Sequence, residues 1–433
     1  MYISSDKEEV AVAHQHKIRN KFCPYVLIFF SLLFSLPAIA GDFHLDTTVL
    51  GQVRDNDELE KEVPVNGYLG LGVNQPSWHL SGESNMRFFR DFDQKVNDYD
   101  LYQTVLHFKP LEYFQLDLGR QFINQGFTAS VIDGIMLQLM QSKQIDVTLY
   151  SGIPRSVEIG DFNRNDGLLS GLTVAMKKVH NTTAHFHFAW RKNDITQSDL
   201  KKNDELYVGV DVSHQFPVTT TPMIYGLFEY DVAAKVINTG TAGIDIYPIS
   251  QLALNAEFNY FNINRDTNRP TIFSLFTQGN LMQGRFAATW TIVPEYLDFI
   301  CSYSYQNEKV IEGDRQQGHL IDAAFQVSVE QVGFHIEPGY YYQKSFGGHL
   351  NGVRALIHEQ FTDKFYADLG VDFAKYVKIT NNNDNAFSTI IWSGYEVVKG
   401  LTLSGGFEYN TNTFFNRDIR GSFKVAYVFD HGI

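Results

Sequence analysis

The chain has 433 residues, of which 44% are hydrophobic and 19% charged, so it is long enough for a large folded structure and too apolar for a disordered one. Its 35 Lys and Arg against 49 Asp and Glu give a net charge of -14, which argues against nucleic-acid binding because that activity needs a basic face. The mean hydropathy is -0.20, and the sequence lacks the several apolar stretches of about 20 residues that a helical transporter needs.

Residues 1–40 have the pattern of a secretory signal peptide. Three basic residues between positions 17 and 21 precede an apolar run from Tyr25 to Leu36, and Ala38-Ile39-Ala40 forms a small-x-small cleavage signal. We expect cleavage near Ala40, which leaves residues 41–433 as one exported domain. A single membrane anchor is the alternative, but the run is short for a hydrocarbon core about 30 Å thick.

From residue 41 onward, nearly every segment alternates apolar and polar residues. Ile145, Val147 and Leu149, for example, are each followed by Asp, Thr or Tyr, and segments 114–119 and 365–374 repeat this pattern. A period of two predicts strands with one apolar and one polar face, whereas no segment keeps a helical period. An all-strand chain of this length favours a single large sheet.

Short and long turns alternate along the chain. The short turns fall near residues 75, 110, 142, 180, 218, 249, 294, 330, 361 and 399. Longer segments rich in Asn, Asp and Gly lie between them, at 91–99, 161–167, 193–204, 265–283, 307–318 and 381–385. With a first strand from Phe43 to Val53 and a last from Arg417 to Phe429, the ten hairpins make twenty-two strands, with eighteen or twenty as alternatives.

This arrangement predicts an all-β fold: a single closed antiparallel transmembrane β-barrel of about 22 strands (18–22), with short periplasmic turns and longer extracellular loops. Aromatic residues near both ends of the strands are typical of the two interfacial girdles of such barrels. They are Trp190, Tyr230, Tyr260, Tyr303, Tyr305 and Tyr340–Tyr342 near the longer loops, and Phe108, Tyr113, Tyr247, Tyr296 and Phe365 near the short turns. A soluble solenoid would repeat with a shorter period, and a sandwich rarely carries so many aromatic residues at strand ends.

Two segments resemble outer-membrane proteins of Gram-negative bacteria. In the last strand, Phe423, Val425, Tyr427 and Phe429 share one face, as in the terminal assembly strand of these proteins, although residues 430–433 extend past the usual final aromatic residue. The segment Leu118-Gly119-Arg120-Gln121, with Gly126 and Asp133-Gly134 after it, is similar to a strand-loop-strand element of porin and export-channel families. The resemblance implies a porin-like barrel in the outer membrane and specifies no substrate.

Some outer-membrane barrels are enzymes, and two pairs of residues in this chain could in principle take part in catalysis or metal binding. His185 and His187 share a strand face, as do His335 and Glu337, so metal ligation is geometrically possible. The sequence favours ordinary polar positions facing water, because no zincin, nucleophile-elbow, phosphate-loop or haem motif is present. We therefore predict no catalytic residue, no metal site, no cofactor and no enzymatic activity.

If the apolar positions face lipid, the alternation assigns charged residues to the lumen, the space that the barrel encloses. The predicted pore-lining residues are Asp117, Asp146, Asp211, Glu229, Asp245, Glu257, Asp298, Glu337, Asp368, Asp372, Glu408, Arg191, Arg285, Arg354 and Lys424. The lumen is therefore acidic on balance, which favours cations over anions. Charge that merely accompanies water in a wide barrel is the plainer interpretation.

Barrels of about 22 strands normally contain a plug, and no plug domain precedes the first predicted strand. Segment 265–283, with its apolar stretch Ile272-Phe273-Ser274-Leu275-Phe276, is the candidate for an inward-folded loop.

The sequence thus favours an outer-membrane porin-like channel for passive passage of small solutes, preferring cations. The alternatives are a sheath or export channel around a partner protein, such as the barrel of a multihaem cytochrome conduit, and a barrel enzyme. The oligomeric state is left open.

Overall fold

A computed structural model describes residues 41–432 apart from 57–60, 126–127, 141–143, 156–166, 193–203, 263–276, 311–314, 346–347, 379–382 and 413–415. The predicted signal peptide lies outside the described residues. Within them, no helix has the length and apolar character needed to cross a membrane. The described chain is built from twenty-two strands in one sheet, so the predicted strand number is confirmed.

The strands follow one another along the chain. Their bounds are β1 Asp42–Asn56, β2 Pro64–Gln75, β3 Leu80–Asp91, β4 Val96–Leu111, β5 Phe114–Gln125, β6 Thr128–Met140, β7 Ile145–Arg155, β8 Leu168–Val179, β9 Thr182–Lys192, β10 Glu205–Gln215 and β11 Met223–Asp231. The remaining strands are β12 Val236–Ile249, β13 Leu252–Asn262, β14 Thr277–Val293, β15 Leu297–Val310, β16 Arg315–Val329, β17 Phe334–Ser345, β18 Gly348–Thr362, β19 Phe365–Lys378, β20 Asn383–Val398, β21 Leu401–Thr411 and β22 Asp418–Gly432. Two 3-10 turns, η1 Pro76–Trp78 and η3 Glu330–Val332, connect strands.

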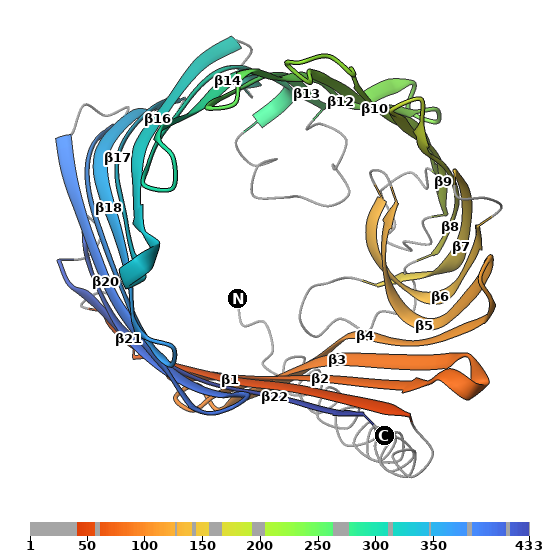
Figure 1. Cartoon of the computed structure of the whole chain (residues 1–433), viewed down its shortest axis with the longest axis horizontal. Helices are drawn as coiled ribbons and strands as arrows, with labels where there is room; N and C mark the ends of the chain where they lie inside the picture. Colours follow the sequence, from red (N-terminus) through yellow and green to blue (C-terminus); the bar gives the residue numbers. More distant parts are fainter. Residues whose placement is uncertain are drawn as a thin grey trace, which may run out of the picture.

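The sheet closes on itself. Each strand pairs antiparallel with its neighbours in sequence, and β1 also pairs with β22, from Asp42 opposite Gly432 to Asn56 opposite Asp418. Figure 1 shows the resulting ring, with the red and blue ends of the chain side by side. Because closure leaves no free strand edge, the ladder satisfies the backbone hydrogen-bonding groups that a lipid environment could not.

One rim of the barrel carries connections at the ten predicted places, and most of them are tight turns, whereas β10 and β11 are joined by the longer segment 216–222. Residues 180–181, 250–251, 363–364 and 399–400, for example, each join two strands directly, and η1 and η3 form two of the other turns. His79 (φ 53°) and Gly400 (φ 86°) occupy the left-handed region that such turns require. The start of β1 and the end of β22 lie at this rim, as the even strand number predicts.

The opposite rim has shorter connections than the sequence predicts at four places. Residues 92–95 alone join β3 to β4, β14 already begins at Thr277, β15 and β16 continue through 307–310 and 315–318, and β20 begins at Asn383. The predicted loops at 91–99, 265–283, 307–318 and 381–385 were therefore too long. Polar side chains can face water on both sides of a ladder, so strand pairing continues through polar sequence. Predicted loop residues 161–166, 193–203 and 265–276 lie outside the described residues.

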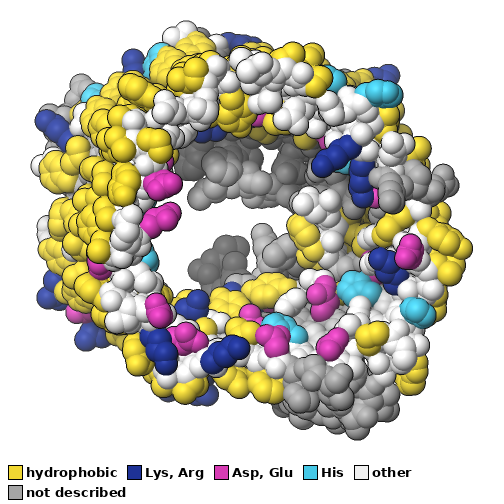
Figure 2. Space-filling view, in the orientation of Figure 1, with side chains coloured by type: hydrophobic (Ala, Val, Ile, Leu, Met, Phe, Trp, Pro, Cys, Tyr) yellow, Lys and Arg dark blue, Asp and Glu magenta, His cyan; other side chains and the backbone are white. Residues whose placement is uncertain are grey.

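The alternation of residues separates two faces of the wall. Phe186, Val353 and Ile391 are each more than half exposed on the outer face. Figure 2 shows this apolar exterior, and acidic and basic side chains around the inner opening. Among the predicted girdle residues, Tyr341 is a correction because it points inward: it lies over Gly352, and its hydroxyl donates to Asp372 Oδ1 over 2.6 Å. An inward Tyr fits there because the opposite residue has no side chain.

Candidate functional site: the lumen and its inward hairpin

The strand register places all fifteen predicted pore-lining residues on one face of the sheet, opposite the apolar face. Direct pairing links them across the wall: Asp211 lies opposite His185, Glu257 opposite Arg285, and Arg354 opposite Asp372. The fifteen residues come from fourteen of the strands: β5 (Asp117), β7 (Asp146), β9 (Arg191), β10 (Asp211), β11 (Glu229), β12 (Asp245), β13 (Glu257), β14 (Arg285), β15 (Asp298), β17 (Glu337), β18 (Arg354), β19 (Asp368, Asp372), β21 (Glu408) and β22 (Lys424). Their role in a pore stays a prediction.

Most of these carboxylates have polar partners on the same face. Asp117, whose side chain is almost fully buried, lies 2.6 Å from His107 Nδ1. Glu257 Oε2 accepts a hydrogen bond of 2.8 Å from the Tyr225 hydroxyl. Arg354 donates to Asp322 Oδ2 over 2.6 Å and lies 3.5 Å from Glu337. The inner wall is therefore a network of paired groups rather than a row of separate charges.

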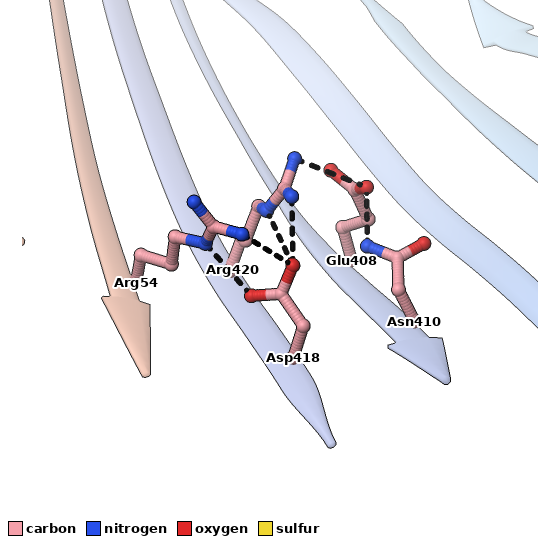
Figure 3. Close-up of polar contacts among 5 residues, drawn as sticks. All are labelled: Arg54, Glu408, Asn410, Asp418 and Arg420. Carbon is pink, nitrogen blue, oxygen red and sulfur yellow. Dashed lines mark hydrogen bonds and ion pairs between the residues drawn. The ribbon is translucent and has the colours of Figure 1, made fainter. Parts of the chain in front are cut away.

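Sequence reasoning missed a charged cluster at the seam where the barrel closes (Figure 3). Asp418 on β22 has a fully buried side chain and receives Arg54 of β1 at 2.9 and 3.1 Å and Arg420 of β22 at 2.7 Å. Arg420 also reaches Glu408 of β21 at 3.6 Å, and Glu408 accepts from Asn410. Alternation already places Glu408 on this face and could also have placed Arg420 and Asn410 there, but only closure brings Arg54 to them.

The β5–β6 hairpin is paired into the wall through β4 and β7, but the part toward the end of β5 and the start of β6 bends into the ring (Figure 1). A row of directly paired glycines marks the fold: Gly119 lies opposite Gly134, which lies opposite Gly152. A Cβ on Gly134 would overlap with the Ser151 carbonyl oxygen, and Gly119 has φ 126°. Only glycine tolerates such close backbone approach, so the row permits a sharp crease in the sheet.

The crease brings the inner face of the hairpin against the inner face of β7 and β8, and a small apolar core forms between them. Ile123 and Ile132 of the hairpin pack with Tyr150 of β7 and Leu169 of β8, and each of the four is at most 5% exposed. Met136 packs against this cluster. Since buried aliphatic and aromatic side chains each contribute about 1.5 to 3 kcal/mol, this core can hold the hairpin in its inward position.

Ion pairs brace the crease on its other side. Asp133 of β6 accepts from Arg120 Nε at 2.6 Å and from Arg155 Nε at 2.6 Å, and Arg120 Nη1 donates to the Leu101 carbonyl oxygen of β4. The two strands that flank the hairpin, β4 and β7, are thereby tied to its base. The segment that resembles porin and export-channel families, residues 118–121 with Asp133-Gly134, thus supplies two of the three glycines and two of the bracing charges.

The described element that enters the lumen is the β5–β6 hairpin, which the sequence did not predict, whereas most of the predicted inward loop 265–283 lies outside the described residues. Within segment 265–283, residues 277–283 belong to β14, which pairs with β13 and β15 in the wall. The remainder, including the apolar stretch 272–276, lies outside the described residues. The sequence argument searched for an apolar loop, whereas the observed inward element is a strand hairpin with ordinary alternation.

Of the histidine pairs considered for chemistry, one is brought together and the other is not. His335 Nδ1 lies 2.9 Å from Ser328 Oγ, while Glu337 accepts from Gln326 and faces Arg354, so these two residues do not form one site. His185 and His187 instead converge on Asp211. The side chain that joins them comes from β10, the neighbouring strand, and the sequence alone does not give that register.

These features define a closed 22-stranded barrel with a charged inner face and one hairpin inside it. No model of a known protein family matches the chain, and no curated protein is significantly similar to it. The solved structures similar to the chain include three proteins of Pseudomonas aeruginosa, OpdL, OpdQ and OpdK. OpdL is 10% identical with a TM-score of 0.48, covering 90% of this chain and 98% of OpdL, and OpdQ is 9% identical with a TM-score of 0.47 and shares of 90% and 98%.

The third, OpdK, is an outer membrane protein whose structure has also been determined with vanillate. In the vanillate structure it is 8% identical with a TM-score of 0.45, covering 90% of this chain and 99% of OpdK. The chain thus resembles these barrels in overall architecture. At such identities and scores, the resemblance adds nothing to what the strand register already establishes.

Proposed function

We propose that the protein is an outer-membrane channel for passive passage of small solutes, narrowed by its own β5–β6 hairpin. The observation that carries this proposal is a closed barrel with an apolar exterior, a charged interior and an inward hairpin held by a packed core. An apolar outer band suits a bilayer, and a polar interior suits water and dissolved solutes. Export through a signal peptide cleaved near Ala40 belongs to the same proposal.

The direct test is conductance of the folded, purified barrel in planar lipid bilayers. We expect stable single-channel steps, and we expect the boiled protein to give none. As a check of folding, the unheated barrel should migrate faster on a denaturing gel than the boiled chain does. Folding to a detergent-free soluble monomer would contradict the membrane assignment.

Within this proposal, the channel prefers cations. The fifteen assigned residues comprise eleven carboxylates and four cations, and the register keeps all of them on one face. Arg54 and Arg420 add positive charge at the seam, but Asp418 and Glu408 pair with them. The remaining excess of charge on the inner face is negative, and the electric field of this charge raises the local concentration of cations.

The width of the barrel favours a second candidate, a sheath around a partner protein. Barrels of about 22 strands usually hold a plug, and the hairpin occupies only one side of the ring (Figure 1). If the barrel is such a sheath, the isolated barrel should conduct far more than the barrel with its partner bound. Adding a partner protein encoded near this gene should then reduce the conductance. A small conductance that no periplasmic partner alters would argue for the channel alone.

A further inference from the structure

We propose that His185, His187 and Asp211 form a binding site for a divalent transition-metal ion in the inner wall of the barrel. His185 and His187 lie two residues apart on β9, so both side chains leave the same face. Asp211 lies directly opposite His185 on β10. In the described part of the chain, this is the one group of three potential ligands that meets within 4.8 Å.

Both imidazoles already contact the Asp211 carboxylate, one on each oxygen. His185 Nδ1 lies 2.6 Å from Asp211 Oδ1, and His187 Nε2 lies 2.7 Å from Asp211 Oδ2. A tetrahedral zinc ion needs Zn–N and Zn–O distances of about 2.0 to 2.2 Å, which places its ligands about 3.3 Å apart. Each of the two His–Asp contacts therefore needs to lengthen by well under 1 Å to admit the ion, and the three ligand atoms already lie within 4.8 Å of one another.

The chemistry of the donors fits a borderline metal ion. Two neutral imidazoles and one carboxylate form the ligand set of several catalytic zinc sites, and imidazole also suits copper and nickel. Hard ions such as Ca²⁺ and Mg²⁺ prefer sites built from oxygen atoms alone. The carboxylate supplies one negative charge, so binding partly neutralises the dication.

A second hydrogen-bonding partner can orient one ligand. Thr173 of β8 has its hydroxyl 3.2 Å from His187 Nδ1. Without metal, His187 Nε2–H donates to Asp211, and Nδ1 accepts from the threonine hydroxyl. With metal on Nε2, the proton moves to Nδ1 and the same hydroxyl accepts it, because a hydroxyl can both donate and accept. Thr173 thus fixes the ring in either state, as outer-shell partners of metal-binding histidines do.

The site is open on one side and closed on the other. The side chains of His185, His187 and Asp211 are 33%, 10% and 29% exposed, so the group is accessible without being on the surface. Thr173, almost fully buried, closes the base of the site. Three protein ligands with an open fourth position leave room for water or for a ligand atom of a solute.

Other His–Asp pairs of the inner wall show why the second imidazole matters. His107–Asp117 and His358–Asp368 each have a single short His–Asp contact, at 2.6 Å. Neither pair has a second histidine nitrogen on the same carboxylate among the described residues. They are ordinary hydrogen-bonded pairs, whereas Asp211 joins two imidazoles.

The test uses the full folded barrel in detergent, stripped with a chelator and titrated with Zn²⁺ in a calorimeter. We expect one saturable site per chain in the unaltered protein. Asp211→Asn and His187→Gln should each abolish it, and Thr173→Val should weaken it by about 10- to 100-fold. His214→Gln is the matched control, since His214 lies on the same strand as Asp211 and on its opposite face; its affinity should be unchanged.

Heat-modifiable migration verifies that each variant is folded before titration. Absence of saturable binding in the unaltered barrel, or unchanged binding in both Asp211→Asn and His187→Gln, would overturn the proposal. Weakening by His214→Gln equal to that by His187→Gln would also overturn it, because binding would then be nonspecific. Since the titration measures binding and not conductance, its outcome is separate from that of the channel proposal.

Discussion

At the residue scale, neighbouring positions on β19 should tolerate charge very differently. Leu369 lies on the outer face, paired with Ile357 and Ile391, whereas Asp368 lies on the inner face opposite His358. An Arg at Leu369 would meet acyl chains and should reduce the free energy of unfolding by about 2 to 4 kcal/mol if it lies near the midplane. Denaturant titration of the barrel refolded in lipid vesicles measures this.

The control for Leu369→Arg is Asp368→Arg, which introduces the same side chain one position away. Its cost should be much smaller because the guanidinium stays in water, although it loses the contact with His358. Equal costs at the two positions would show that the faces of β19 are assigned wrongly.

At the scale of elements, the crease of the β5–β6 hairpin makes a specific prediction for Gly134. An alanine methyl group there would overlap with the Ser151 carbonyl oxygen and approach the Gly152 backbone, so Gly134→Ala should open the crease. Overpacking of this kind costs about 1 to 3 kcal/mol. If the hairpin leaves the lumen, single-channel conductance should rise, and bilayer recordings would detect the change.

Gly284→Ala is the matched control for Gly134→Ala. Gly284 lies in the interior of β14, and a Cβ there would meet no atom within 4 Å. This variant should leave conductance and stability unchanged. A Gly134→Ala barrel with unaltered conductance would mean that the hairpin does not narrow the pathway.

The contrast between wall and crease shows what sequence can specify. Alternation is local, so the strands and their two faces follow from residues such as Ile145, Val147 and Leu149, and the places where alternation is interrupted indicate the ten connections of one rim. The crease depends on glycines from three strands that meet only through the register. Glycines inside predicted strands were the available signal, because a strand interior disfavours glycine without a structural reason. Similarly, His185 and His187 lie two residues apart on one strand, but Asp211 joins them only through strand pairing.

At the scale of the whole molecule, closure depends on the seam between β1 and β22. Asp418 is fully buried there and shared by Arg54 and Arg420 (Figure 3). Asp418→Asn would leave two guanidinium groups facing each other without their common carboxylate. Removing one partner of a buried ion pair costs about 3 to 5 kcal/mol, and we expect the lower end because both arginines are partly exposed.

The readout for Asp418→Asn is the temperature at which the folded form disappears from a denaturing gel, which should fall. Asp55→Asn tests the same seam without burial, because Asp55 pairs with Arg417 at 3.4 Å where both side chains are about half exposed. Exposed pairs contribute at most about 1 kcal/mol, so this control should change little. A similar fall in both variants would mean that burial of Asp418 is not what matters.

Selectivity is the other property of the whole barrel, because it depends on the summed field of the inner wall. In a KCl gradient, the reversal potential should show K⁺ permeating faster than Cl⁻. Screening should reduce this preference toward 1 M salt, where the Debye length falls from about 10 Å at 0.1 M to about 3 Å.

Neutralising Asp245 and Asp368 together, as Asp245→Asn and Asp368→Asn, should reduce the preference for cations, since both side chains lie on the inner face. Asp363→Asn, in the tight turn after β18, removes the same charge from the rim and should change the potential much less. A channel selective for anions would show that the arginines, and not the carboxylates, dominate the field along the pathway.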